Sequence, residues 1–68
     1  MMSGWIRVSE RAPEHNQRVI YFAYAKREKC IGRYRGMSKD SGVHYFWSYG
    51  RMDTARWWMP LPEDPEEE

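Results

Sequence analysis

The chain has 68 residues with 11 Lys/Arg and 10 Asp/Glu, a formal net charge of +1. This length holds one domain, which buries only about 60% of its unfolded surface. The single cysteine, Cys30, excludes an intrachain disulfide, and together with His15 and His44 it is too few for a four-ligand zinc site. No apolar run approaches the roughly 18 residues that span a bilayer, and no secretory leader is evident. One free thiol predicts an intracellular, reducing compartment, with which a bacterial or phage cytoplasm is compatible.

The charges are segregated along the chain. Residues 63–68 hold five of the ten acidic residues, whereas residues 1–62 hold eleven basic and five acidic ones, a balance of +6. We therefore expect a single small β domain over residues 1–62 and a disordered, solvated acidic tail over residues 63–68. The alternative is that the tail folds back on the basic face or recruits a basic partner.

Short stretches rich in β-branched and aromatic residues predict strands. In chain order they are 5–8, 18–25, 29–35, 43–49 and 54–59. Both faces of 18–25 are apolar, which is typical of a central strand. Charged or glycine-bounded connections are expected at 26–28, 36–42 and 50–53. Gly32, in the middle of a strand, predicts a bulge or a close approach to the backbone.

These strands, with no segment of helical periodicity, predict an all-β fold. We expect a single small curled antiparallel meander, or an SH3-like small barrel, of four to five strands. Apolar clusters at the two ends, around Trp5 and Trp58, are expected to pack in one group, with Met59 or Leu61 against them. The expected large core side chains are Trp5, Tyr21, Phe22, Phe46 and Trp58.

The sequence offers no catalytic constellation. Ser9, His15 and the nearby glutamates lie in a polar loop, without the shaped pocket and oxyanion donors that a triad requires. Cys30 is interpreted as a small core residue, and His44 as a satisfied histidine at the rim. We therefore expect no enzymatic activity and no cofactor.

Arginines interleave with aromatic residues, a pattern that favours binding. Trp, Tyr, Met and Arg are enriched at protein interfaces, which predicts a protein-interaction module whose partner is another protein or a second copy of the chain, as in a homodimer. The alternative is a module that binds single-stranded nucleic acid by stacking and arginine contacts. No membrane is expected as a partner. The predicted binding surface consists of Arg33, Tyr34, Arg35, Tyr45, Trp47, Arg51, Arg56 and Trp57.

The order of motifs resembles domain of unknown function family 551. The matching features are Trp5-Ile6-x-Val8, Pro13, Gln17-Arg18-Val19, Gly32, Phe46 and the closing Trp58-Met59-Pro60-Leu61-Pro62. The chain departs from the family pattern at Ala12, where Leu is usual, and at Trp57, where His or another polar residue is frequent. The resemblance covers nearly the whole chain. It implies a phage or prophage accessory protein of enterobacteria, which would act in the cytoplasm of the bacterial host cell on a host protein, and it implies no activity.

Overall fold

The computed structural model describes residues 4–62, so the predicted tail at 63–68 lies outside the described residues. Five strands make up the fold, and no helix occurs in the described part of the chain. They are β1 (Ile6–Arg7), β2 (Arg18–Ala23), β3 (Glu28–Met37), β4 (His44–Ser48) and β5 (Arg51–Pro60).

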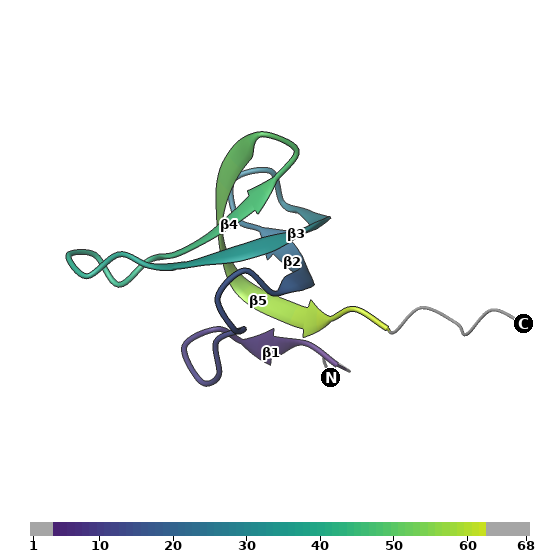
Figure 1. Cartoon of the computed structure of the whole chain (residues 1–68), viewed down its shortest axis with the longest axis horizontal. Coiled ribbons are helices and arrows are strands. Elements are labelled where there is room, and N and C mark those ends of the chain that lie inside the picture. Colours follow the sequence, from purple (N-terminus) through teal and green to yellow (C-terminus); the bar gives the residue numbers. More distant parts are fainter. Residues whose placement is uncertain (1–3, 63–68) are drawn as a thin grey trace, which may run out of the picture.

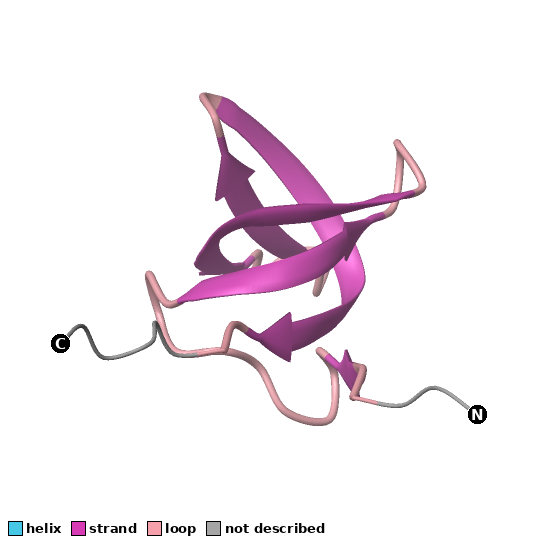
Figure 2. Ribbon diagram, turned by 90° about the vertical axis from the view of Figure 1, so that its right-hand side faces the viewer, coloured by secondary structure: helices cyan, strands magenta, loops and turns pink. Residues whose placement is uncertain are grey.

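The strands form one antiparallel sheet in the order β1-β5-β2-β3-β4. β5 also pairs with β4 through its first residues, whereas its later residues pair with β2 and β1. The sheet therefore curls strongly, and the β3–β4 hairpin projects from the body (Figure 1). Figure 2 shows the curl from a second side. The prediction of a single small, all-β, antiparallel fold is confirmed, although β5 lies between β1 and β2 and the sheet is neither a simple meander nor a closed barrel.

β2 is the central strand, as its apolar faces predicted, because it lies between β5 and β3. Its inward side chains, Val19, Tyr21 and Ala23, are fully buried. The outward Ile20 and Phe22 are half-buried. Period-two alternation thus separates a dry inner face from a partly covered outer face.

β4 and β5 are joined by a tight two-residue turn at Tyr49 and Gly50. Ser48 pairs with Arg51, and the two turn residues have φ angles of 50° and 79°. Two successive positive φ values are typical of a type I′ turn, whose twist matches that of the flanking strands. The expected connection at 50–53 is therefore wrong: β5 begins at Arg51 and is ten residues long.

Gly32 marks a close approach of two backbones, as its mid-strand position predicted. A Cβ at Gly32 would overlap the carbonyl oxygen of Trp47 on β4. Beside it, the Ser48 hydroxyl donates to the Ile31 carbonyl at 2.8 Å. Further along, a register shift between Tyr34 and Gly36 bends β3 toward its hairpin.

The core is small and aromatic. Tyr21 and Phe46 stack with ring centroids 4.5 Å apart, and the Tyr34 ring meets Phe46 edge-on at 5.2 Å. The Tyr21 hydroxyl donates to Asp53 at 3.1 Å, and burial raises the pKa of this phenol. The core also contains Val8, Val19, Ala23, Ala55 and Trp58.

The two ends of the domain meet, but not through the predicted pair of tryptophans. Ile6 pairs with Trp58 and Arg7 with Trp57, so Ile6 and Trp58 face inward while Trp5 faces outward. Trp5 instead packs edge-on against Phe22 at 6.5 Å, and both rings are half-buried. The placement of Trp5 and Phe22 in the core, and of Trp5 beside Trp58, is therefore wrong.

Candidate interaction surface

One row of outward side chains crosses four strands of the sheet. Arg18 pairs with Arg33, Arg33 with Trp47, and Trp47 with Met52. Directly opposed residues in antiparallel strands project from the same face, with Cβ atoms about 5 Å apart. The register therefore places two arginines, a tryptophan and a methionine side by side on the outer face.

Large apolar side chains are exposed at the Trp47 end of this row. Exposed fractions are 42% for Ile31, 42% for Trp47, 92% for Tyr49 and 52% for Met52. Ile31 lies two residues before Arg33 on the same face of β3, and Tyr49 stands in the adjoining turn. We call these four residues the apolar face. Clustered exposed apolar groups, unlike scattered ones, mark interaction sites.

The other end of the row is basic. Arg33 donates to the Asn16 backbone carbonyl at 3.0 Å, and Arg35 donates to the Asn16 side-chain oxygen at 3.2 Å. We call Arg18, Arg33 and Arg35 the arginine strip. Within residues 4–62, no carboxylate lies within ion-pair distance of these three guanidinium groups. Since opposed like charges destabilise a sheet, the Arg18–Arg33 pair is not explained by stability.

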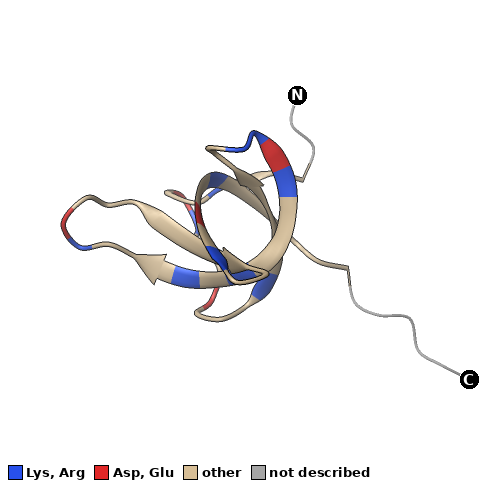
Figure 3. Ribbon diagram, turned by 90° about the horizontal axis from the view of Figure 1, so that it is seen from above, with Lys and Arg blue, Asp and Glu red and all other residues tan. Residues whose placement is uncertain are grey.

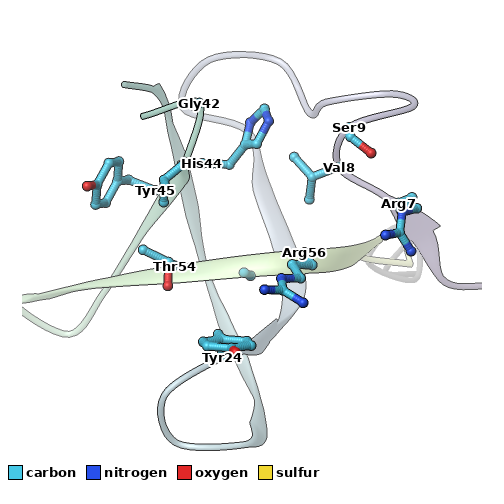
Figure 4. A pocket seen from close by; sticks show the side chains of 11 residues that line it. Arg7, Val8, Ser9, Tyr24, Gly42, His44, Tyr45, Thr54 and Arg56 are labelled. Carbon is cyan, nitrogen blue, oxygen red and sulfur yellow. The ribbon is translucent and has the colours of Figure 1, made fainter. Parts of the chain in front are cut away.

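A pocket of about 520 Å³ opens between β4, β5 and the segment after β1 (Figure 4). Arg56 lies over the Tyr24 ring at 4.5 Å, on one side, whereas His44 and Val8 lie on the other. Arg7 lies over the Trp57 ring at 5.0 Å. The lining is largely apolar, so the pocket can accept an aliphatic or aromatic group beside two cations.

His44 and Tyr34 form a linked pair at the base of the β3–β4 hairpin. The Tyr34 hydroxyl lies 2.8 Å from His44 Nδ1. Burial raises the pKa of Tyr34 and lowers the pKa of His44. Burial favours the neutral imidazole, whose Nδ1 accepts a hydrogen bond from the Tyr34 hydroxyl when the ring proton is on Nε2, and His44 is the satisfied rim histidine that the sequence predicted.

The structure divides the predicted binding residues among several places. Arg33, Arg35 and Trp47 lie together on the outer face, and Arg51 is exposed beside the β4–β5 turn. Tyr45 and Arg56 line the larger pocket, whereas Trp57 lines a second pocket of about 380 Å³. Tyr34 is buried in the core at 6% exposure, so it is not part of the exposed surface of the free chain.

Sequence reasoning missed Asn16, Arg18, Ile31, Tyr49 and Met52. Ile31 shares its β3 face with Arg33, and this alternation was visible in the sequence. Met52 was missed because it was predicted to lie in a turn. In the structure β5 already begins at Arg51, which brings Met52 opposite Trp47. No sequence signal indicated that Asn16 anchors two arginines. Cys30, interpreted as core, is half-buried and packs against the core.

Residues 4–62 contain neither a metal-binding cluster nor a membrane-spanning helix. No three His, Cys, Asp or Glu side chains there are grouped closely enough to hold a metal ion. The same residues include no helix with the length and hydropathy needed to cross a membrane.

Comparison with known proteins gives one match. No curated protein and no solved structure matches the chain. The model of a family described as a protein of unknown function, DUF551, matches residues 4–66. Since this match spans nearly the whole sequence, the chain belongs to the DUF551 family.

Proposed function

We propose that this protein is a small, non-enzymatic protein-interaction module that binds its partner through the apolar face and the adjoining arginine strip. The row from Arg33 through Trp47 to Met52 carries the proposal. It joins an exposed tryptophan to a methionine on one side and an arginine on the other, residue types that dominate binding energy at protein interfaces.

The geometry of this face favours binding because its backbone is held before any partner arrives. β4 pairs with β3 on one side and with β5 on the other. The two-residue turn and the Ser48–Ile31 hydrogen bond fix the position of the end of β4 where it joins β5. A preorganised surface loses less conformational entropy on binding than a mobile loop does.

The chemistry of the face favours one kind of partner. The apolar face requires an apolar patch, and the arginine strip beside it requires carboxylates. Basic residues occur on several strands of the domain (Figure 3), and the arginine strip supplies the local positive charge that favours an acidic patch on the partner. The partner that fits is an acidic bacterial host protein with an exposed apolar patch; a homodimer is the alternative.

The second candidate function is binding of single-stranded nucleic acid. Trp47 directly opposite Arg33 is the observation that favours it, because bases stack on exposed rings beside cations. Burial of Tyr34 removes one predicted stacking ring. The acidic residues at 63–68 bring the net charge to +1, which weakens phosphate capture. We therefore rank this function second.

The test compares Trp47→Ala with Tyr24→Ala in affinity capture from a bacterial lysate. Tyr24 is a matched control because it is also an exposed aromatic, at 53%, but lies at the larger pocket. We expect one defined partner that survives nuclease treatment, is lost with Trp47→Ala and is retained with Tyr24→Ala. Sedimentation of the purified chain separates a second copy from a foreign partner.

A direct titration of the protein with an oligonucleotide tests the second candidate function. Tight binding of an unstructured oligonucleotide at physiological salt would overturn the protein-binding proposal, provided that Arg33→Ala and Arg35→Ala each reduce its salt slope by about one unit for every phosphate that the arginine had neutralised. Retention of the protein partner by Trp47→Ala would show that the apolar face is not the binding site.

A further inference from the structure

The last described residues leave the sheet beside the arginine strip. Val19 pairs with Pro60 in the antiparallel β2–β5 ladder. The chain after Pro60 therefore runs toward the start of β2, and Leu61 comes level with Arg18. Arg33 lies one strand further across, because it pairs with Arg18.

The segment that follows is short, acidic and long enough to reach the strip. Residues 63–68 contain five carboxylates and one proline. Six extended residues span about 20 Å, whereas neighbouring strands lie about 4.8 Å apart. Crossing β2 to reach Arg33 on β3 needs about 10 Å, so the segment is long enough for its carboxylates to reach the strip.

The strip has the properties of a receptor for carboxylates. It presents three exposed guanidinium groups, two of them oriented by Asn16. No carboxylate of residues 4–62 pairs with them. Arginine binds carboxylates through two parallel N–H donors, which makes such contacts specific as well as attractive.

We infer that residues 63–68 dock on Arg18, Arg33 and Arg35 and thereby cover the basic half of the interaction surface. Each exposed ion pair is weak and screened by salt. The short tether nevertheless holds the carboxylates at an effective concentration in the millimolar range. The docked segment is a resident competitor, so that only a partner that also engages the apolar face displaces it.

Nuclear magnetic resonance of the full chain tests the docking without a partner. The comparison is between the native chain and a variant with Glu63, Glu66, Glu67 and Glu68 changed to Gln and Asp64→Asn. We expect the side-chain Nε–Hε signals of Arg18, Arg33 and Arg35 to move between the two. Arg27, at the opposite end of β2, is an internal control and should not move. The difference should vanish near 1 M salt, where the screening length is about 3 Å.

A synthetic peptide with the sequence of residues 63–68 provides a second measurement. Added to the five-substitution variant at low salt, it should return the three arginine signals toward their native positions. Unchanged signals for Arg33 and Arg35 in the variant would overturn the docking, and so would equal shifts of every arginine, which would indicate a general electrostatic field. Because neither measurement involves a partner, failure here leaves the proposed function standing.

Discussion

Trp57 and Trp58 are neighbours in the sequence with opposite structural roles. Trp58 is 2% exposed, and its indole N–H donates to the Arg11 carbonyl at 2.7 Å. Trp57 is half-buried on the outer face, where Arg7 lies over its ring. Strand alternation explains the difference, because successive side chains point to opposite faces. The hydrogen bond from Trp58, together with the one from the Val8 N–H to the Arg56 carbonyl, thus ties the turn after β1 to β5.

Trp58→Ala should unfold most of the protein. The substitution leaves a large cavity and an unpaired carbonyl, at a cost of about 3–5 kcal/mol, comparable to the whole stability of a small domain. Trp57→Ala is the matched control and should cost far less. Thermal unfolding followed by circular dichroism measures both. Native-like melting of Trp58→Ala would contradict its place in the core.

His44 should make stability depend on pH below neutrality. Burial lowers the pKa of His44 in the folded protein from its ordinary 6.5, so the unfolded chain binds more protons below that pH. The contribution of neutral His44 to the free energy of unfolding is therefore fully present above about pH 6.5. It is lost as the pH drops toward the folded-state pKa of His44. Protonation also removes the acceptor for the Tyr34 hydroxyl.

The measurement is the melting temperature between pH 7.5 and pH 5 for the native chain, His44→Gln and His15→Gln. We expect the decline to be smaller in His44→Gln alone, because His15 is exposed in the loop before β2. Equal declines in all three proteins would assign the pH dependence to the carboxylates.

At the scale of elements, the β3–β4–β5 unit was the hardest part to predict. Composition located each strand, since aromatic and β-branched residues mark a pleated, half-buried surface. The turn was misplaced because Tyr49-Gly50 lacks the usual Asn-Gly signature, although it adopts the same backbone angles. Register depends on contacts between distant strands, so the Arg33–Trp47–Met52 row could not be derived from local pattern alone.

Gly32→Ala should disrupt the β3–β4 pairing. The added methyl would meet the Trp47 carbonyl, a backbone atom that cannot move without separating the strands. We expect a loss of about 3 kcal/mol, the upper end of overpacking costs. Gly42→Ala is the matched control: it meets nothing within 4 Å and should cost only about 1 kcal/mol for its positive φ. Denaturant unfolding measures both, and equal losses would contradict the close approach.

At the scale of the whole molecule, contacts between aromatic rings account for much of the packing in the core. The stacked and edge-on contacts of Tyr21, Tyr34 and Phe46 fill the space inside the curl. The sequence correctly identified Tyr21, Phe46 and Trp58 as core residues but exchanged Tyr34 for Trp5 and Phe22. The eleven aromatic residues of the chain have more side-chain volume than so small a core can hold. Which of the rings remain outside depends on how the sheet curls.

The acidic segment should regulate partner binding by covering the arginine strip and should contribute little to folding. Residues 63–68 bring carboxylates and one proline, without a large apolar side chain to bury. Exposed ion pairs with the arginine strip add at most about 1 kcal/mol, which shifts the melting temperature of so small a domain by less than about 8 °C. A chain truncated after Pro62 should therefore melt close to the native chain in differential scanning calorimetry, and the small difference should disappear at 1 M salt. A loss of stability that persists in high salt would mean that the segment packs on the domain by apolar contacts, and docking on the arginines would no longer describe it.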